Sequence, residues 1–427
     1  MAKEDVVVVG GGAVGVCCAH ELARIGRGVL LLEKGDLAAG SSYGNSGLIP
    51  TSVCSPLAAP GVISQSLRWM LDPNGAFRLR PQARAQFARW LWLFRRFCNI
   101  GSWERGSILA RDLVRASRPL FEELAQQADF GYRQTGVLAL YRSQEALEHG
   151  IESAEALARL DIASEMLDRP TVEKRVARVQ PRVVGGIHFP EDASLDPPRF
   201  VTSVGKLAES LGARIQTSTR VIRMRTTGER ITALETSTGD FEPHLVVLAA
   251  GSWSRELATA LGLELLIEPG KGYSLTFPDQ GYSDAPLRLS EARTVVTSLS
   301  GTVRATSKLD LVGFDLGLDA RRLRGIPKHV EGYLKLDAEL DTAESWCGLR
   351  PLTPDGLPLI GRHESASNLL LATGHGHLGV ALSPITARLV GQLAATEEPE
   401  INLDPFRADR FASGTRADRS ARGRHAD

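Results

Sequence analysis

The chain has 427 residues and carries 50 Lys and Arg against 50 Asp and Glu, which gives a formal net charge of zero. Hydrophobic residues make up 43% and charged residues 23%, so a wholly disordered or fibrous protein is excluded, and the lack of a basic excess argues against a nucleic-acid partner. The length is that of two domains. The 42 glycines are about 10% of the chain, above the usual share of roughly 7%. This excess indicates tight turns or backbone close to a ligand.

The first 35 residues predict a strand, a turn, a helix and a second strand. Val6–Val9 and Val29–Leu32 are short apolar runs, typical of strands buried on both faces. Between them Val14–Ile25 has a helical pattern, and Gly26 is placed to end the helix. Residues 36–65 are rich in Gly, Ser and Pro and are expected to form a loop.

Helices and strands alternate along the rest of the chain. Helices are expected at 82–100, 107–128, 144–160, 200–211, 319–340 and 380–395. Strands are expected at 137–141, 215–225, 231–236, 245–249, within 272–314, and at 344–349 and 369–372. This order predicts an α/β fold, in which a Rossmann-like nucleotide-binding domain is interleaved with an antiparallel α+β substrate domain. The nucleotide-binding domain is assigned to 1–55, 150–262 and 335–412, the substrate domain to 56–149 and 263–334, and a disordered tail to 413–427.

The five cysteines are scattered and include no C-x-x-C pair. No metal site is therefore expected, and unpaired thiols indicate a reducing compartment. The acidic start is unlike a signal peptide, and no apolar run reaches the roughly 18 residues of a membrane-spanning helix. We therefore expect a cytoplasmic protein.

A glycine fingerprint follows the first predicted strand. Gly10, Gly12 and Gly15 spell G-x-G-x-x-G, and Glu33 ends the second strand. Gly10 permits a tight turn, Gly12 lets the backbone approach a pyrophosphate, and Gly15 lets the helix pack close to the strand. The helix N-terminus suits phosphates, and Glu33 would bind an adenosine ribose. The pattern predicts a dinucleotide site but does not separate NAD from FAD.

The small polar segment Ser41–Gly47 lies just beyond Glu33. Its backbone could follow an extended cofactor, and its hydroxyls and amides could bond pyrophosphate and ribityl groups. A plain surface loop is the alternative. The segment favours a flavin dinucleotide over NAD.

Gly374, Gly376 and Gly379 repeat the same spelling between a predicted strand and a predicted helix. An acid, Glu397, stands at the matching distance, but it lies in a polar run with no second strand to carry it. A second dinucleotide site is therefore rejected. The segment is expected to aim a helix N-terminus at the pyrimidine end of a flavin, with a helix cap that holds no ligand as the alternative.

Six stretches are informative in combination: Gly10–Gly15 with Glu33, Ser41–Gly47, Leu245–Ser254, Pro269–Tyr273, Gly348–Gly356 and Gly374–Gly379. Together they resemble the D-amino acid dehydrogenases of the FAD-dependent D-amino acid oxidase superfamily, which also contains glycine and sarcosine oxidases. The resemblance implies the two-domain fold with FAD bound non-covalently. With the motifs, it implies these FAD-binding residues: Gly10, Gly12, Ala13, Val14, Gly15, Glu33, Lys34, Ser41, Ser42, Asn45, Ser46, Gly47, Leu48, Val221, Ala250, Gly251, Gly374, His375, Gly376, Leu378 and Gly379.

The resemblance also implies that Arg350 pairs with the substrate carboxylate, a role that suits a planar and permanently charged guanidinium. His375, Tyr273 and Tyr43 are the further candidates for catalytic contact with the substrate. His377 is an alternative to His375 as proton acceptor, although the reaction needs none if the amine binds neutral.

Two other residues bear on the flavin. Sarcosine oxidases attach their flavin through a cysteine, and an alignment on Thr353-Pro-Asp355 places Gly348 at that position, with Cys347 one residue away. One step along a strand turns a side chain to the opposite face, so covalent attachment is not expected. Lys271 is a candidate for placing a charge near the flavin, which would raise its reactivity towards oxygen.

The expected reaction is oxidative deamination of a D-amino acid, with proline and hydroxyproline types as candidates, by hydride transfer from Cα to flavin N5. The electrons would pass to a respiratory acceptor, either a quinone or an electron-transfer protein. The alternatives are an oxidase of N-methyl or secondary amino acids and an electron-transfer flavin subunit without turnover. An NAD-dependent dehydrogenase ranks last because it gives no role to the segments Ser41–Gly47 and Gly374–Gly379. The oligomeric state stays open.

An aromatic helix raises the question of a membrane. Phe87–Phe97 combines arginines with Trp90, Phe94 and Phe97 on one helical face. Such a face could lie in the interface of the inner membrane, as a peripheral contact, or could pack inside the substrate domain.

Overall fold

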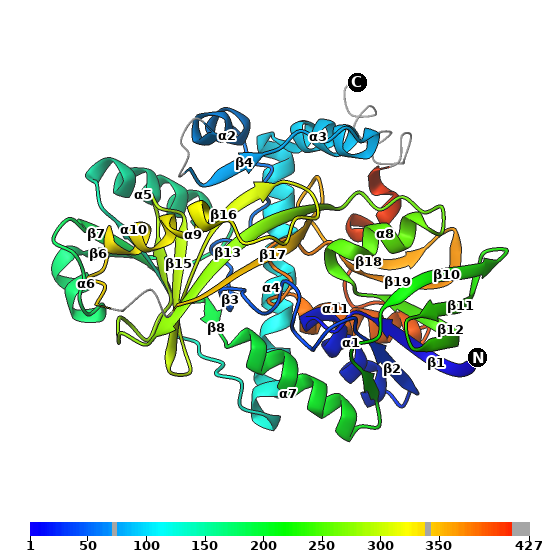
Figure 1. Ribbon diagram of the computed structural model, residues 1–427. Helices are drawn as coiled ribbons and strands as arrows, with labels where there is room; N and C mark the ends of the chain where they lie inside the picture. The colour runs from blue at the N-terminus through cyan, green and yellow to red at the C-terminus, as the bar shows by residue number, and fades with distance from the viewer. Residues whose placement is uncertain (71–74, 338–342, 412–427) are drawn as a thin grey trace.

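The computed structural model describes residues 1–70, 75–337 and 343–411, so the tail expected at 413–427 lies outside the described residues. Two large sheets lie side by side, with helices on their outer faces (Figure 1). The sheet that contains the N-terminus is on the right of Figure 1, and the second sheet is on the left. The predicted α/β class, with a Rossmann-like part and a second antiparallel part, is confirmed.

The first sheet has a parallel centre. Its parallel strands, in spatial order, are β9 (Arg214–Gln216), β2 (Val29–Leu32), β1 (Ala2–Val9), β12 (Gly239–Leu248) and β19 (Ala366–Thr373). Its antiparallel strands are β10 (Val221–Thr227) and β11 (Arg230–Thr236) beside β12, and β18 (Leu359–His363) beside β19. Ligands of such sheets bind beyond the carboxyl ends of the parallel strands, so the cofactor is expected there.

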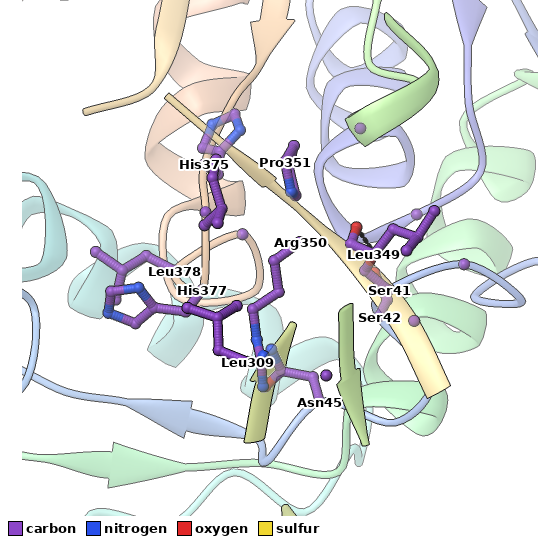
Figure 2. Close-up of a pocket in the computed structure, with 18 of the residues that line it drawn as sticks. Ser41, Ser42, Asn45, Leu309, Leu349, Arg350, Pro351, His375, His377 and Leu378 are labelled. Carbon is purple, nitrogen blue, oxygen red and sulfur yellow. Dashed lines mark hydrogen bonds between the residues drawn. The ribbon is translucent and has the colours of Figure 1, made fainter. Parts of the chain in front are cut away.

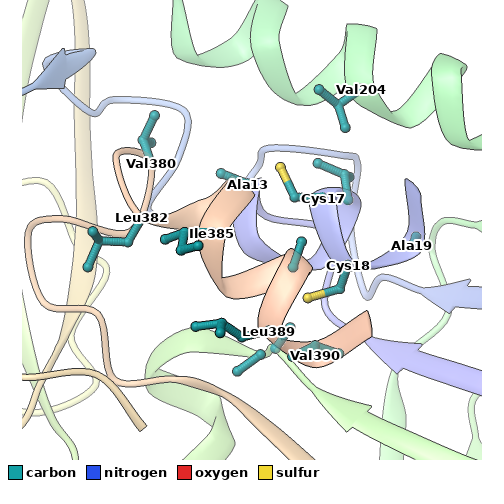
Figure 3. Packing of buried hydrophobic residues seen from close by; sticks show 14 of the residues in the cluster. Ala13, Cys17, Cys18, Ala19, Val204, Val380, Leu382, Ile385, Leu389 and Val390 are labelled. Atoms are coloured by element: carbon teal, nitrogen blue, oxygen red, sulfur yellow. The ribbon is translucent and has the colours of Figure 1, made fainter. Parts of the chain in front are cut away.

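Burial on both faces explains the apolar runs of the central strands. Val6 and Val8 of β1 point into one core, and Val7 and Val9 point into the core on the opposite face, all at most 4% exposed. Four helices build the first core: α1 (Ala13–Arg24), α4 (Ile100–Gln127), α7 (Pro197–Ser210) and α11 (Ser383–Ala394). Two others contribute to the second: α3 (Ala85–Phe97) and α8 (Ser254–Thr259). Figure 3 shows how small side chains such as Ala13 and Cys17 allow α1 and α11 to approach.

The second sheet is mostly antiparallel. Its path runs β17 (Glu344–Leu352), β13 (Glu268–Pro278), β16 (Thr302–Leu311), β15 (Thr294–Leu299), β14 (Leu287–Leu289), β5 (Val137–Tyr141), β7 (Gly185–Phe189) and β6 (Glu165–Asp168), with β4 (Phe77–Leu79) beside β16. Helices α5 (Gln144–Ala158), α6 (Arg169–Arg175), α9 (Ala320–Leu323) and α10 (Gly325–Glu331) belong to this half. Strands β3 (Leu48–Ile49) and β8 (Ala193–Ser194) pair separately, and α2 (Val62–Met70) lies near β4.

The sheet pairing differs from the expected domain boundaries. Strands β6 and β7 lie within 150–262 and β17 lies within 335–412, yet all three pair in the second sheet. Helix α4 lies mostly within 56–149 but packs into the core of the first sheet. Boundaries taken from the order of elements miss such exchanges, because strand pairing is set by contacts between distant segments.

Several local expectations also change. The helix expected over 319–340 is two short helices, α9 and α10, and its last residues lie outside the described part. Helix α11 begins at Ser383, and turns occupy the residues after Gly376. The segment 36–65, expected to be a loop, contains β3 and the start of α2.

The aromatic face of α3 packs inwards. Trp90 is 2% exposed, its indole N–H donates to the carbonyl oxygen of Leu352 at 3.0 Å, and its ring stacks on Phe94 at 5.2 Å. Phe94 and Phe97 are partly buried and pack against the same core. Within the described residues, no helix is long and apolar enough to span a bilayer.

Candidate active site

A cavity of about 1180 Å³ is lined by residues of both sheets. Its size exceeds the roughly 300–1,000 Å³ of an ordinary ligand pocket and suits a long cofactor together with a substrate. The predicted site residues in its wall are Gly10, Gly12, Ala13, Val14, Glu33, Lys34, Ser41, Ser42, Asn45, Ser46, Leu48, Val221, Ala250, Gly251, Tyr273, Arg350, His375, Gly376, Leu378 and Gly379. Four predicted residues are outside the wall: Gly15, Tyr43, Gly47 and Gly374.

The first glycine turn has the geometry that the fingerprint predicts. Gly10 has φ +114°, and a Cβ there would stand 2.6 Å from the carbonyl oxygen of Ala249 on the neighbouring strand. A Cβ at Gly15 would overlap the carbonyl oxygen of Gly10, so only glycine lets α1 pack this closely. Gly12 is the N-cap of α1, with no side-chain cap, and the cavity opens beside it. The N–H groups of this helix end that donate to no side-chain cap, unlike that of Ala13, suit a pyrophosphate.

The side chains of Glu33 and Ser42 hold the first glycine turn through hydrogen bonds to its backbone N–H groups. The Glu33 carboxylate accepts hydrogen bonds from the N–H of Gly11 at 2.6 Å and of Gly35 at 3.0 Å. Each carboxylate oxygen keeps a second lone pair, so a ribose hydroxyl could still bind Glu33. The Ser42 hydroxyl accepts from the N–H of Ala13 at 3.0 Å, which ties the small polar segment to the start of α1.

Two of the glycines outside the wall have packing roles. Gly47 has φ +74°, and a Cβ there would overlap the carbonyl oxygen of Leu195. Gly374 has φ +73°, and a Cβ there would press on Thr353 and Leu359. They shape the loops that carry cavity residues without facing the cavity.

Arg350 of β17 reaches into the cavity (Figure 2). Among the described residues it forms no ion pair, and its one hydrogen bond runs from Nη1 to the carbonyl oxygen of Lys308 at 3.0 Å. Burial lowers the pKa of Arg350 to about 10, which still leaves it charged at neutral pH. A cation held in this way, with donors left over, is suited to bind a carboxylate.

The backbone around Arg350 is held by both halves of the molecule. The hydroxyls of Ser41 and Ser252 donate to the carbonyl oxygen of Leu349, the residue before it. On the other side, the N–H of Gly376 donates to the carbonyl oxygen of Pro351 at 2.9 Å. Ser252 was not among the predicted site residues, although it lies inside the quoted stretch Leu245–Ser254.

The neighbouring strands make room for the guanidinium. A Cβ at Gly272 on β13 would overlap the guanidinium of Arg350, which explains a glycine in the stretch 269–273. Lys308 sits at a β-bulge of β16 with φ +69°, and its carbonyl faces Arg350. Bulges commonly redirect groups beside active sites. Neither residue was predicted as part of the site.

The two predicted tyrosines do not offer free hydroxyls to the cavity. Tyr273 lines the wall, but its hydroxyl donates to Asp310 at 3.1 Å, and burial together with that carboxylate raises its pKa. Tyr43 lies outside the wall, and its hydroxyl donates to Glu344 at 2.7 Å. The contact of Tyr43 with the substrate stays a prediction, since Ser42 and Gly44 line the cavity and Tyr43 does not.

The two histidines of the late glycine segment differ. His375 is 3% exposed, its Nε2 bonds to the hydroxyl of Thr386 at 2.9 Å, and burial lowers its pKa to about 3. It therefore lacks the basicity that a proton acceptor needs near neutral pH. His377 also lines the cavity, and its Nε2 bonds to the carbonyl oxygen of Val53 at 3.0 Å.

Of the two other residues discussed for the flavin, Lys271 does not line the cavity, whereas Cys347 does. Lys271 is fully buried, and its ammonium donates to the carbonyl oxygen of Gly317 at 2.5 Å and pairs with Asp315 at 3.3 Å. The thiol of Cys347 lies against the carbonyl oxygen of Leu316 at 3.2 Å, and burial raises its pKa. A protonated, engaged thiol is a poor nucleophile for flavin attachment.

The geometry therefore fits a flavin dinucleotide: an open helix end for the pyrophosphate, an acid for the ribose, and a long cavity that ends at an arginine. A family model described as DAO, FAD dependent oxidoreductase, matches residues 5–393. The chain belongs to this family. The predicted cofactor, FAD, and the predicted class, an FAD-dependent oxidoreductase, are confirmed.

Similar proteins agree with the family. The chain is 33% identical over 425 residues to a D-amino acid dehydrogenase of Cereibacter sphaeroides, with 97% of each chain covered. It is 31% identical over 418 residues to a D-amino acid dehydrogenase of Agrobacterium fabrum, covering 96% of this chain and 100% of the relative. The glycine oxidase of Geobacillus kaustophilus shares the fold with a TM-score of 0.75 at 23% identity, covering 96% and 99% of the two chains. L-proline dehydrogenase from P. horikoshii also shares it, with a TM-score of 0.71 at 20% identity and coverage of 96% and 98%.

Proposed function

We propose that the chain oxidises a D-amino acid and passes the electrons to a respiratory acceptor, a quinone or an electron-transfer protein. The observation that carries the proposal is Arg350, a guanidinium at the cavity wall with donors left for a substrate carboxylate. The relatives named D-amino acid dehydrogenase, aligned over 97% of the chain, support the same substrate class.

The chain's own residues bind and orient the substrate. Arg350 would hold the carboxylate by paired hydrogen bonds, which fixes the position of Cα in the cavity. FAD, when bound, supplies the acceptor for the hydride of Cα. Apolar wall residues such as Leu309 and Val295 would take the side chain and exclude water, which suits compact apolar substrates of the proline type.

The position of Lys271 removes one argument for an oxidase. Its ammonium is held by Gly317 and Asp315 and does not line the cavity, so it cannot place its charge against the flavin to assist oxygen. The exposed apolar side chains of α2, with Leu67 60% exposed and Met70 43% exposed, border the cavity and would suit an apolar acceptor such as a quinone.

A substrate panel tests the proposal. Purified FAD-loaded protein is mixed without oxygen with D- and L-amino acids, including proline and hydroxyproline, and the flavin absorbance is recorded. We expect bleaching with D-amino acids, turnover with a quinone-like dye, and little peroxide in air. Rapid peroxide formation with an N-methyl amino acid would point to the oxidase instead, and no bleaching with any amino acid would contradict the proposal.

A further inference from the structure

His377 lines the cavity, and of its two ring nitrogens only Nε2 has a hydrogen-bond partner among the described residues. Its Nε2 lies 3.0 Å from the carbonyl oxygen of Val53, and a carbonyl can only accept, so Nε2 carries the proton. In a neutral imidazole the other nitrogen, Nδ1, then holds a lone pair. Among the described residues, no donor bonds to Nδ1, while the side chain lines the cavity and is only partly buried.

Hydrogen bonds from the two residues before Val53 to Asp192 hold the backbone that presents the Val53 carbonyl. The fully buried Asp192 accepts hydrogen bonds from the N–H groups of Thr51 at 2.7 Å and Ser52 at 3.1 Å, and from both hydroxyls. These four bonds fix the backbone immediately before Val53. The carbonyl that orients the His377 ring is therefore held in place, and so is the direction of Nδ1.

The surroundings keep His377 neutral. Burial and the charge of Arg350 both lower its pKa, and Lys308 and Arg293 line the same cavity. The carboxylates that the described residues contribute to the wall, Glu33 and Glu256, belong to the half of the first sheet. Nδ1 is thus an acceptor on a residue that lines the same cavity as Arg350. Figure 2 shows the two residues in the wall of that cavity.

We propose that Nδ1 of His377 accepts a hydrogen bond from the substrate amine while Arg350 holds the carboxylate. This inference rests on the proposed function and adds the group that recognises the amine. A carboxylate contact alone lets Cα rotate, and both enantiomers could then present a hydrogen to the flavin. A second contact to the amine fixes the rotation, so that the side chain and the Cα–H have defined directions and one enantiomer reacts.

The substitutions His377→Gln and His377→Asn test the roles of Nε2 and Nδ1 separately. Gln at 377 can place an amide N–H where Nε2 stands and keep the Val53 contact, but it has no acceptor at the place of Nδ1. Asn at 377 places an amide oxygen near Nδ1 but cannot reach Val53. Both variants are purified with FAD, and kcat/KM is measured for the best D-amino acid and for its L-enantiomer. Binding of propanoate, a carboxylate without an amine, is measured from the flavin spectrum.

We expect His377→Gln to lose roughly 10- to 100-fold in kcat/KM and to discriminate less between enantiomers, with propanoate affinity unchanged. His377→Asn, which keeps an acceptor near Nδ1 but loses the Val53 contact, should retain more kcat/KM and more enantiomer discrimination than His377→Gln. If His377→Gln matches the wild type, or if His377→Asn loses as much as His377→Gln, the inference is overturned, because the ring then acts through Val53 or not at all. A wild type that oxidises no amino acid overturns the proposed function as well.

The pH profile of the wild type gives a test that needs no stable variant. Protonation of Nδ1 removes the acceptor and places a second cation beside Arg350. Because its pKa lies below the usual 6.5, protonation of His377 should add a further fall in kcat/KM only below that pH, beyond the slope set by the substrate amine. A profile with no acid limb while the protein stays folded would contradict the inference.

Discussion

The two glycine segments of this chain have the same spelling but build different structures. At Gly10–Gly15 the helix starts at Ala13, inside the motif, and the third glycine is pressed against the first. At Gly374–Gly379 the helix starts only at Ser383, and a Cβ at Gly379 would meet nothing closer than the Cβ of His375 at 3.7 Å. The first segment begins a helix whose N-terminus lines the cavity, and the second is a turn that carries His375 and His377. A shared motif therefore does not imply a shared site.

Alanine at the third glycine of each segment should give the largest contrast. In Gly15→Ala the new Cβ overlaps backbone that cannot move, so we expect loss of FAD binding and a fall of more than about 3 kcal/mol in the free energy of unfolding. In Gly379→Ala the contact is ordinary and φ is not positive, so stability should stay within about 1 kcal/mol. Denaturant unfolding with FAD titration measures both, and equal losses would mean that the segments are alike after all.

Removing Arg350 should affect turnover and leave the cofactor in place. Arg350→Ala loses two charge-assisted hydrogen bonds to the substrate carboxylate, so kcat/KM should fall about 10²–10³-fold. The first glycine segment is untouched, so the protein should remain yellow with the FAD content of the wild type. Steady-state kinetics and the absorbance spectrum check this, and normal kinetics would remove Arg350 from the site.

Protonation of His375, in the segment Gly374–Gly379, should lower the stability of the protein at acid pH. Its folded pKa of about 3 lies below the ordinary 6.5, so the unfolded chain binds more protons between these pH values and stability falls as the pH drops below 6.5. The loss at pH 5 is about 2 kcal/mol. His375→Gln should show a correspondingly smaller difference between unfolding at pH 7 and at pH 5. An identical pH dependence in both proteins would show that His375 titrates normally.

The smallest effect, on FAD binding, is expected from Ser42→Ala beside the first glycine segment. Ser42→Ala removes the hydrogen bond to the N–H of Ala13 at the start of α1. One such bond is worth about 1 kcal/mol, so FAD should bind about fivefold more weakly. Turnover at saturating FAD should match the wild type. A loss of turnover that added FAD does not restore would place Ser42 on the substrate side of the cavity.

The sequence predicts what depends on local chemistry. Gly10 and Gly15 have the tight turn and close helix packing that strand, turn and helix in succession predict, whereas the ribose contact of Glu33 stays a prediction. The resemblance also selected Arg350, because the motif around it is compact. These features are encoded within a few neighbouring residues.

Features that depend on distant segments were not predictable. Nothing near Gly272 in the sequence indicates that the guanidinium of Arg350 lies over it, and nothing near Tyr43 indicates that its hydroxyl reaches Glu344. The membership of β17 in the second sheet likewise follows from its pairing with β13, more than seventy residues earlier. Likewise, the spelling of the late motif could not fix where α11 begins.

The carbonyl of Leu349 has a consequence for how this enzyme could evolve. Its strand belongs to the second sheet, yet the hydroxyls of Ser41 and Ser252 anchor it to the opposite half. If Arg350 holds the substrate, as proposed, its backbone therefore stays tied to the half that carries the first glycine turn. Side chains on the other strands of the second sheet could then change while the position of Arg350 relative to that half is kept.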